Sequence, residues 1–77
     1  MSYEWKPKNS HKTMWDLWDS GWGHEELLGY VIFYEPYSSW GVHRKVQGGY
    51  ICEVPFTKGL TLPEAKQFLE TICRISK

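Results

Sequence analysis

Five side chains of this sequence could ligate a metal ion: His11, His24, His43, Cys52 and Cys73. Structural zinc sites usually space their ligands in close pairs, such as C-x-x-C or H-x-x-x-H. None of the five residues is paired in this way. We therefore expect no metal site and no cofactor, and we interpret the two cysteines as small buried apolar residues.

A cysteine beside a histidine could instead act as an activated nucleophile. Cys52 and His43 belong to neighbouring expected strands, but the alternation of side chains along those strands places them on opposite faces. Glu35 and Glu53 are a second pair that adjacent strands could bring together for acid–base chemistry. The sequence contains no G-x-S-x-G, P-loop or G-x-G-x-x-G motif. We expect a protein that is not an enzyme.

Basic side chains form two groups that could contact nucleic acid. One group is an N-terminal set of lysines, which could follow a phosphate backbone. The other lies on one expected strand, where His43 and Lys45 share a face that could stack bases or enter a groove. The alternative interpretation of this second group is an ordinary solvated strand face. The candidate residues for nucleic-acid binding are Lys6, Lys8, Lys12, His43, Arg44 and Lys45.

The acidic side chains are concentrated beside tryptophans. Residues 16–35 carry five Asp and Glu and no Lys or Arg. Large rigid rings surrounded by charges are typical of interaction hot spots that attract an oppositely charged partner. The alternative is that so small a domain uses these rings as core. The candidate partner-binding residues are Trp15, Asp16, Trp18, Asp19, Trp22, Glu25 and Glu26.

The composition limits the class of protein. The chain has 77 residues, nine Lys and Arg against nine Asp and Glu, and five Trp, five Tyr and three Phe. That length allows one small domain, and the zero formal charge argues against an indiscriminate binder of polyanions. Two cysteines are too few for a disulfide framework, although a single bridge is possible. A helix needs about 20 consecutive apolar residues to span a bilayer, and no apolar run in this sequence approaches that length. We expect a soluble cytoplasmic protein with no membrane contact, and a homo-oligomer that buries surplus rings is possible.

The N-terminal part is predicted to contain an arm and a short helix. Residues 1–9 have no sustained period and are expected to be a flexible arm, with a short strand at Tyr3–Lys6 as the alternative. Residues 10–77 are expected to form a single domain. A short helix is predicted between a cap at Asn9 or Ser10 and a stop at Gly21. The apolar residues at helical spacing in it are Met14, Trp15, Leu17 and Trp18.

Three strands and a second helix are predicted after it. Leu28–Glu35 is β-branched and aromatic, Trp40–Val46 alternates, and Tyr50–Phe56 follows a Gly-Gly hairpin signal. If side chains alternate regularly along this third strand, four of them face the core: Tyr50, Cys52, Val54 and Phe56. Residues 61–64 read Thr-Leu-Pro-Glu, which is a capping box with proline in the first turn, and an apolar stripe continues from there to Ile75.

These elements predict an α+β fold: a short N-terminal helix, a three-stranded antiparallel meander and a C-terminal helix packed on one face of the sheet. The predicted function is a small non-catalytic protein-binding module, an inhibitor or adaptor of the size that phages and mobile elements encode. Its acidic aromatic surface would suit a basic, nucleic-acid-handling protein. The alternative is a nucleic-acid-binding domain that uses the open face of the sheet and the basic arm.

Overall fold

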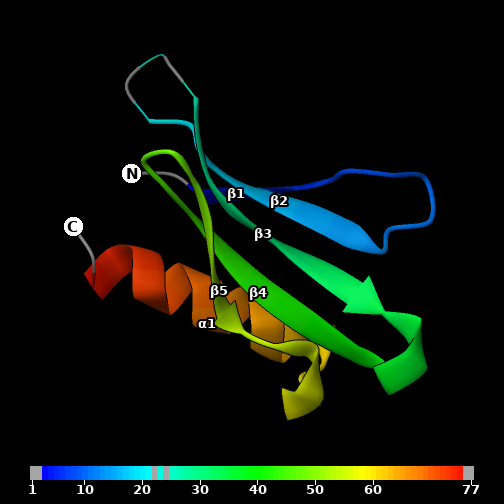
Figure 1. Ribbon diagram of the computed structural model, residues 1–77. Helices are drawn as coiled ribbons and strands as arrows, with labels where there is room; N and C mark the ends of the chain where they lie inside the picture. The colour runs from blue at the N-terminus through cyan, green and yellow to red at the C-terminus, as the bar shows by residue number, and fades with distance from the viewer. Residues whose placement is uncertain (1–2, 22, 24, 76–77) are drawn as a thin grey trace.

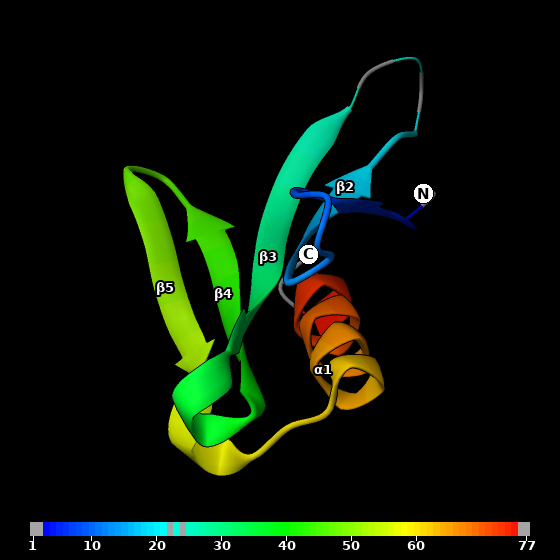
Figure 2. The same ribbon diagram turned by 90° about the vertical axis from the view of Figure 1, so that its right-hand side faces the viewer.

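The computed structural model describes residues 3–21, 23 and 25–75. Five strands form one antiparallel sheet in the order β1-β2-β3-β4-β5, so every strand pairs with its neighbours in sequence. One helix, α1, packs against one face of this sheet (Figure 1, Figure 2). The elements are β1 (Tyr3–Pro7), β2 (Met14–Asp19), β3 (Glu26–Tyr34), the 3₁₀ turn η1 (Glu35–Tyr37), β4 (Ser39–Val46), β5 (Gly49–Val54), the 3₁₀ turn η2 (Phe56–Lys58) and α1 (Leu62–Ile75).

The predicted α+β fold with an N-terminal helix and a three-stranded sheet is wrong: the sheet has five strands and the helix at 10–21 does not exist. Over six residues, apolar side chains at i, i+1, i+3 and i+4 are compatible with a helix turn and also with a strand. The strand is favoured because β1, the alternative considered for the arm, offers it a partner, with Trp5 opposite Leu17 and Pro7 opposite Trp15. Tertiary pairing therefore overrides the local spacing.

The C-terminal helix is present and begins at the predicted capping box. The backbone N–H of Thr61 donates to Glu64 Oε1 at 2.9 Å, and the N–H of Glu64 lies 3.4 Å from Thr61 Oγ1. The hydrogen bonds from Thr61 hold the pKa of Glu64 below its ordinary value. Reciprocal capping satisfies N–H groups that have no partner inside the helix.

The core lies between α1 and the sheet. Ala65, Leu69 and Cys73 of the helix are buried with aliphatic residues of the strands. Gly29 of β3 lies under the helix, where a Cβ atom would lie 3.2 Å from Leu69 Cδ1. We call the side of the sheet that α1 packs on the covered face. Its fully buried strand residues are Leu17, Val31 and Val42.

Two irregularities of register change which side chains reach each face. One lies between Leu17 and Trp18 and the other between Val42 and His43. At the second, Val42 pairs with Val54 but His43 pairs with Cys52, so one residue of β5 is bypassed. A bulge of this kind reverses the alternation beyond it. The β5 residues on the far side of the bulge therefore face the opposite way from the regular pattern.

Candidate functional site

The side of the sheet opposite α1 is not covered by any described element, and we call it the open face. A row of cross-strand partners runs over it through all five strands, because each residue of the row pairs with the next. All five side chains in the row are polar or ionisable. In order from β1 to β5 they are Lys6, Asp16, Tyr30, His43 and Cys52.

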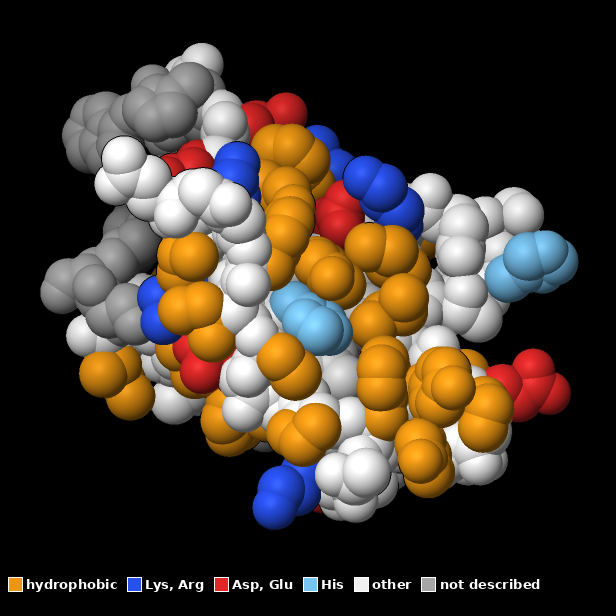
Figure 3. All heavy atoms as spheres, in the orientation of Figure 1, with side chains coloured by type: hydrophobic (Ala, Val, Ile, Leu, Met, Phe, Trp, Pro, Cys, Tyr) orange, Lys and Arg blue, Asp and Glu red, His pale blue; other side chains and the backbone are white. Residues whose placement is uncertain are grey.

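Aromatic rings surround the centre of this row. Tyr30 stacks on His43 with ring centroids 4.7 Å apart and meets Tyr50 edge-on at 5.0 Å. Tyr34 lies against Phe56 at 4.7 Å and against Tyr37 of η1 at 5.4 Å. Figure 3 shows hydrophobic side chains gathered over the sheet in this view, with a histidine among them. We call this set the aromatic patch, and its members are Tyr30, Tyr34, Tyr37, His43, Tyr50 and Phe56.

Three tyrosines of the aromatic patch remain accessible to solvent. Tyr34, Tyr37 and Tyr50 are 42%, 58% and 48% exposed. Phe56 lies directly over Gly41 of β4, where a Cβ atom would come within 2.9 Å of the ring. The glycine thus lets the Phe56 ring lie close to the sheet beside Tyr34. The result is a broad surface of large rings that are ordered by mutual contact before any partner binds.

Two members of the aromatic patch, His43 and Tyr30, are uncharged at neutral pH. Burial lowers the pKa of His43 below its ordinary 6.5, so the imidazole is neutral at pH 7. Burial, followed by the nearby Tyr50, Cys52 and Asp16, raises the pKa of Tyr30, so its hydroxyl keeps its proton. The patch therefore offers apolar ring surface with polar tips.

Cys52 and His43 lie side by side on the open face, contrary to the prediction that they point in opposite directions. The bulge between Val42 and His43 is the reason, because it turns Tyr50 and Cys52 outward while Val54 stays in the core. Cys52 is exposed, so the expectation of a buried residue is wrong there. Cys73 is buried as expected, and no disulfide joins the two.

The predicted partner-binding residues do not form one surface. Trp15 and Trp18 are three positions apart on a strand, so they lie on opposite faces. Trp15 is packed on the core, with Lys66 Nζ 3.8 Å from its ring centroid. Trp18 lies on the open face, where Lys6 Nζ is 5.4 Å from its ring. Trp22 lies outside the described residues.

The acidic members of that set are largely engaged within the chain. Asp16 is buried and lies 3.6 Å from Lys8 Nζ. Asp19 is also buried, and its Oδ1 accepts from the N–H of Gly21 at 3.2 Å. Glu25 pairs with Lys6 at 2.7 Å, which raises the pKa of that lysine. Glu26 is exposed at the start of β3. Lysines of β1 and the loop after it therefore pair with two of these acids, Asp16 and Glu25.

The predicted nucleic-acid-binding residues are also divided. His43 and Lys45 share the open face, as their spacing on β4 requires. Arg44 points to the covered side, where its guanidinium bonds to Glu53. Lys12 is exposed in the turn between β1 and β2, with a left-handed φ of 57°. Of the six basic candidates, only His43 and Lys45 belong to the aromatic patch or adjoin it.

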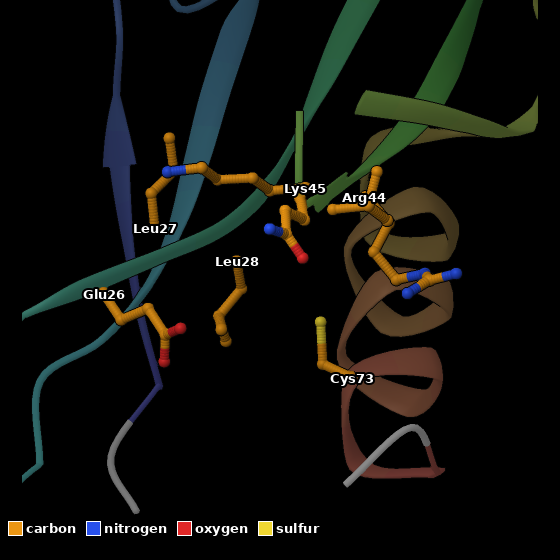
Figure 4. A pocket seen from close by; sticks show the side chains of 8 residues that line it. Glu26, Leu27, Leu28, Arg44, Lys45 and Cys73 are labelled. Atoms are coloured by element: carbon orange, nitrogen blue, oxygen red, sulfur yellow. The ribbon is translucent and has the colours of Figure 1, made fainter. Parts of the chain in front are cut away.

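Two hollows lie elsewhere on the described surface. One has a volume of about 340 Å³ and lies between the ends of β3 and β4 and the helix, with Glu26, Leu28, Gln47 and Cys73 in its lining. Figure 4 shows Cys73 reaching into it from α1. The other is apolar, measures about 500 Å³ and follows the outer side of α1. Within residues 3–21, 23 and 25–75, no three His, Cys, Asp or Glu side chains group closely enough to hold a metal ion.

Comparison with family models, with curated proteins and with solved structures finds no match for this chain. The described part of the chain has no helix long and apolar enough to cross a membrane.

Sequence reasoning missed the tyrosines and Phe56 as a surface set. Tyr30 and Tyr34 are four residues apart in one strand, so their side chains point to the same face of the sheet. Tyr50 was expected to face the core because the bulge in the pairing of β4 with β5 has no clear local signal. Phe56 was expected there because the third strand was predicted to reach it, but β5 ends at Val54 and Phe56 lies in η2. The run Tyr34 to Tyr37 around a proline was the best available indication of exposed rings.

Proposed function

We propose that this chain is a non-catalytic protein-binding module whose docking surface is the aromatic patch on the open face of the sheet. The observation that carries this proposal is the exposure of Tyr34, Tyr37 and Tyr50 on a face that α1 leaves uncovered. Tyrosine supplies a large contact area at a low cost in side-chain entropy and is enriched at interface hot spots. Exposed apolar patches of this kind mark interaction sites in small soluble domains.

The electrostatics support an apolar partner surface. His43 and Tyr30 are uncharged at neutral pH, and the ion pairs of Lys6 with Glu25 and Lys8 with Asp16 balance the charges at the β1 side. A strongly basic partner would gain less from Asp16 and Glu25, because each is already paired with a lysine. We therefore place the partner contact on the tyrosines instead of on the Trp and Asp residues of β2.

Nucleic acid is the second candidate ligand. The stacked pair of Tyr30 and His43, with Lys45 on the same face, supports it because single-stranded binders stack bases on sheet aromatics beside cations. Titration of a labelled single-stranded oligonucleotide at low and physiological salt tests this candidate. Binding that weakens steeply with salt and is lost in Tyr30→Ala would favour it over a protein partner.

A matched pair of variants tests the protein-binding proposal. Tyr34→Ala removes a ring that is 42% exposed on the open face, and Phe68→Ala removes one that is 41% exposed on α1. Tagged wild-type chain and both variants are used to capture partners from a lysate of the source cells, and captured bands are identified and re-tested as purified proteins. We expect Tyr34→Ala to weaken the purified complex at least about tenfold and Phe68→Ala to leave it unchanged. Equal affinity of all three proteins would contradict the proposal.

A further inference from the structure

The two outer strands of the sheet present very different edges. β1 carries Glu4, Lys6 and Pro7, and lysine and proline are the residues by which natural proteins keep an edge from pairing with another chain. The sequence of β5 contains neither Lys nor Pro. Its residues from Gly49 to Cys52 are exposed, and its one charge, Glu53, is bonded to Arg44. One edge is thus protected and the other is open to pairing.

An apolar flank of α1 lies on the same side of the molecule as the open edge. The hollow of about 500 Å³ on this flank is lined by Leu60, Phe68, Ile72 and Ile75 among others. Leu60 forms a backbone bridge with Trp40 of β4 beyond the end of β5, so this flank faces the β5 side of the sheet. Phe68 and Ile75 remain 41% and 78% exposed. The helix packs mainly on β4 and β3, and Figure 2 shows it apart from β5.

Ile51 connects the open edge with the helix flank. It pairs with Arg44, which lines the first hollow together with Cys73 of α1, so Ile51 faces the helix side of the sheet. The side chain is 43% exposed. A strand added to β5 would cover Ile51 and also the helix flank beside it.

We propose that this edge pairs with β5 of a second copy of the chain, giving one continuous antiparallel sheet across a two-fold axis. An antiparallel pair of identical strands is related by such an axis, so each copy contributes the same patch. The axis stands perpendicular to the sheet, which puts both α1 helices on one side with their apolar flanks facing each other. The Ile51 side chains of both copies lie between them.

Charge favours a second copy as the occupant. Directly opposed like charges destabilise strand pairs, and the segment Tyr50–Cys52 has no charge to oppose to itself. Glu53 is paired with the Arg44 guanidinium, so its charge is balanced and is not left to repel its counterpart.

Sedimentation equilibrium of the reduced protein over a wide concentration range tests the proposal. A reductant is present throughout, so that a disulfide between exposed Cys52 thiols does not contribute. We expect a monomer–dimer equilibrium for the wild type, and we expect Ile51→Lys to raise its dissociation constant at least about tenfold, because two like charges then meet at the axis. Hydrogen exchange of the wild type should show concentration-dependent protection within Gly49–Val54.

Tyr37→Lys is the matched control, because it places the same charge on an exposed apolar site of the open face. We expect it to dimerise like the wild type, and circular dichroism confirms that both variants fold. A wild type that is monomeric throughout the range overturns the proposal, as does a dimer that persists in Ile51→Lys. A dimer that Tyr37→Lys disrupts and Ile51→Lys spares would assign self-association to the aromatic patch. Partner binding through that patch is measured separately, so failure of the dimer leaves the proposed function standing.

Discussion

The two faces of the sheet use the same strands for different purposes. On the covered face, aliphatic side chains such as Leu17, Val31 and Val42 are fully buried under α1. On the open face, tyrosines pack against each other, and Tyr34, Tyr37 and Tyr50 remain exposed. Close packing of aliphatic groups gives stability, whereas exposed rings add contact area for a ligand. Under the proposed function, folding and recognition use opposite sides of a single layer, so they should respond to separate substitutions.

The largest change in stability should follow from shortening a side chain that is buried against the covered face. Leu69 is fully buried at the centre of α1, and Leu69→Ala should lower the free energy of unfolding by about 2–5 kcal/mol through the lost burial and the cavity left behind. Ile75→Ala, at the exposed end of the same helix, should change it by less than about 0.5 kcal/mol. Urea unfolding of both variants measures this. Similar losses would show that the core does not extend as described.

A pair of glycines gives a smaller test. A Cβ atom at Gly29 would overlap the backbone oxygen of His43 and press on Leu69, so Gly29→Ala should cost about 1–3 kcal/mol. At Gly41 the nearest atom is Cε1 of Phe56 at 2.9 Å, and that ring can move outward into solvent. Gly41→Ala should therefore lose less stability but should alter the near-ultraviolet circular dichroism of the aromatic patch. An equal loss in thermal unfolding for both would contradict the comparison.

Side chains at the rim of the covered face should contribute less to stability than the buried leucine or the glycines. Lys66 lies 3.8 Å above the ring centroid of Trp15 and 5.4 Å from that of Trp5, while Trp5 Nε1 donates to Glu70 at 2.7 Å. Lys66→Gln removes the cation–π contacts and should lower stability by about 0.5–1 kcal/mol. Lys58→Gln, which removes an exposed lysine from η2, is the matched control. If chemical denaturation gives the two variants the same stability, the ring contacts of Lys66 contribute nothing.

The smallest expected effect is a pH dependence that originates on the open face. Burial lowers the pKa of His43 below its ordinary 6.5, so the unfolded chain binds the proton more readily than the folded chain. The stability from the neutral imidazole is fully present above pH 6.5 and declines as the pH falls below that value toward the folded pKa. Urea unfolding between about pH 5 and pH 8 should show this decline in the wild type and in His11→Phe, an exposed control. His43→Phe, which keeps a stacking ring, should show less of it. A decline of the same size in His43→Phe would assign the pH dependence to another group.

The sequence predicts the second half of this fold better than the first. The capping box at 61–64 and the β-branched run from Tyr30 to Tyr34 are local signals, and the structure contains the corresponding helix and strand. The segment around Trp15 was predicted to be a helix and is a strand, because the spacing of its apolar residues is compatible with both. What decides for the strand is its pairing with β1, which is not visible in the segment itself. Tyr50 was misplaced by a single bulge, which exchanges the faces of Tyr50 and Cys52 and depends on how β4 and β5 align.

The order of elements also determines how this chain can fold while it is being synthesised. Each strand pairs with the strand that precedes it, so the sheet can grow as the chain emerges, but the helix that covers Leu17 and Val31 is made last. The hydrogen bond from Trp5 to Glu70 joins residues 65 positions apart and closes only at that stage. Until then the nascent sheet exposes its aliphatic side to water. Such transiently exposed surface is what chaperones bind and what drives aggregation, so the vulnerable period of this protein falls before α1 is complete.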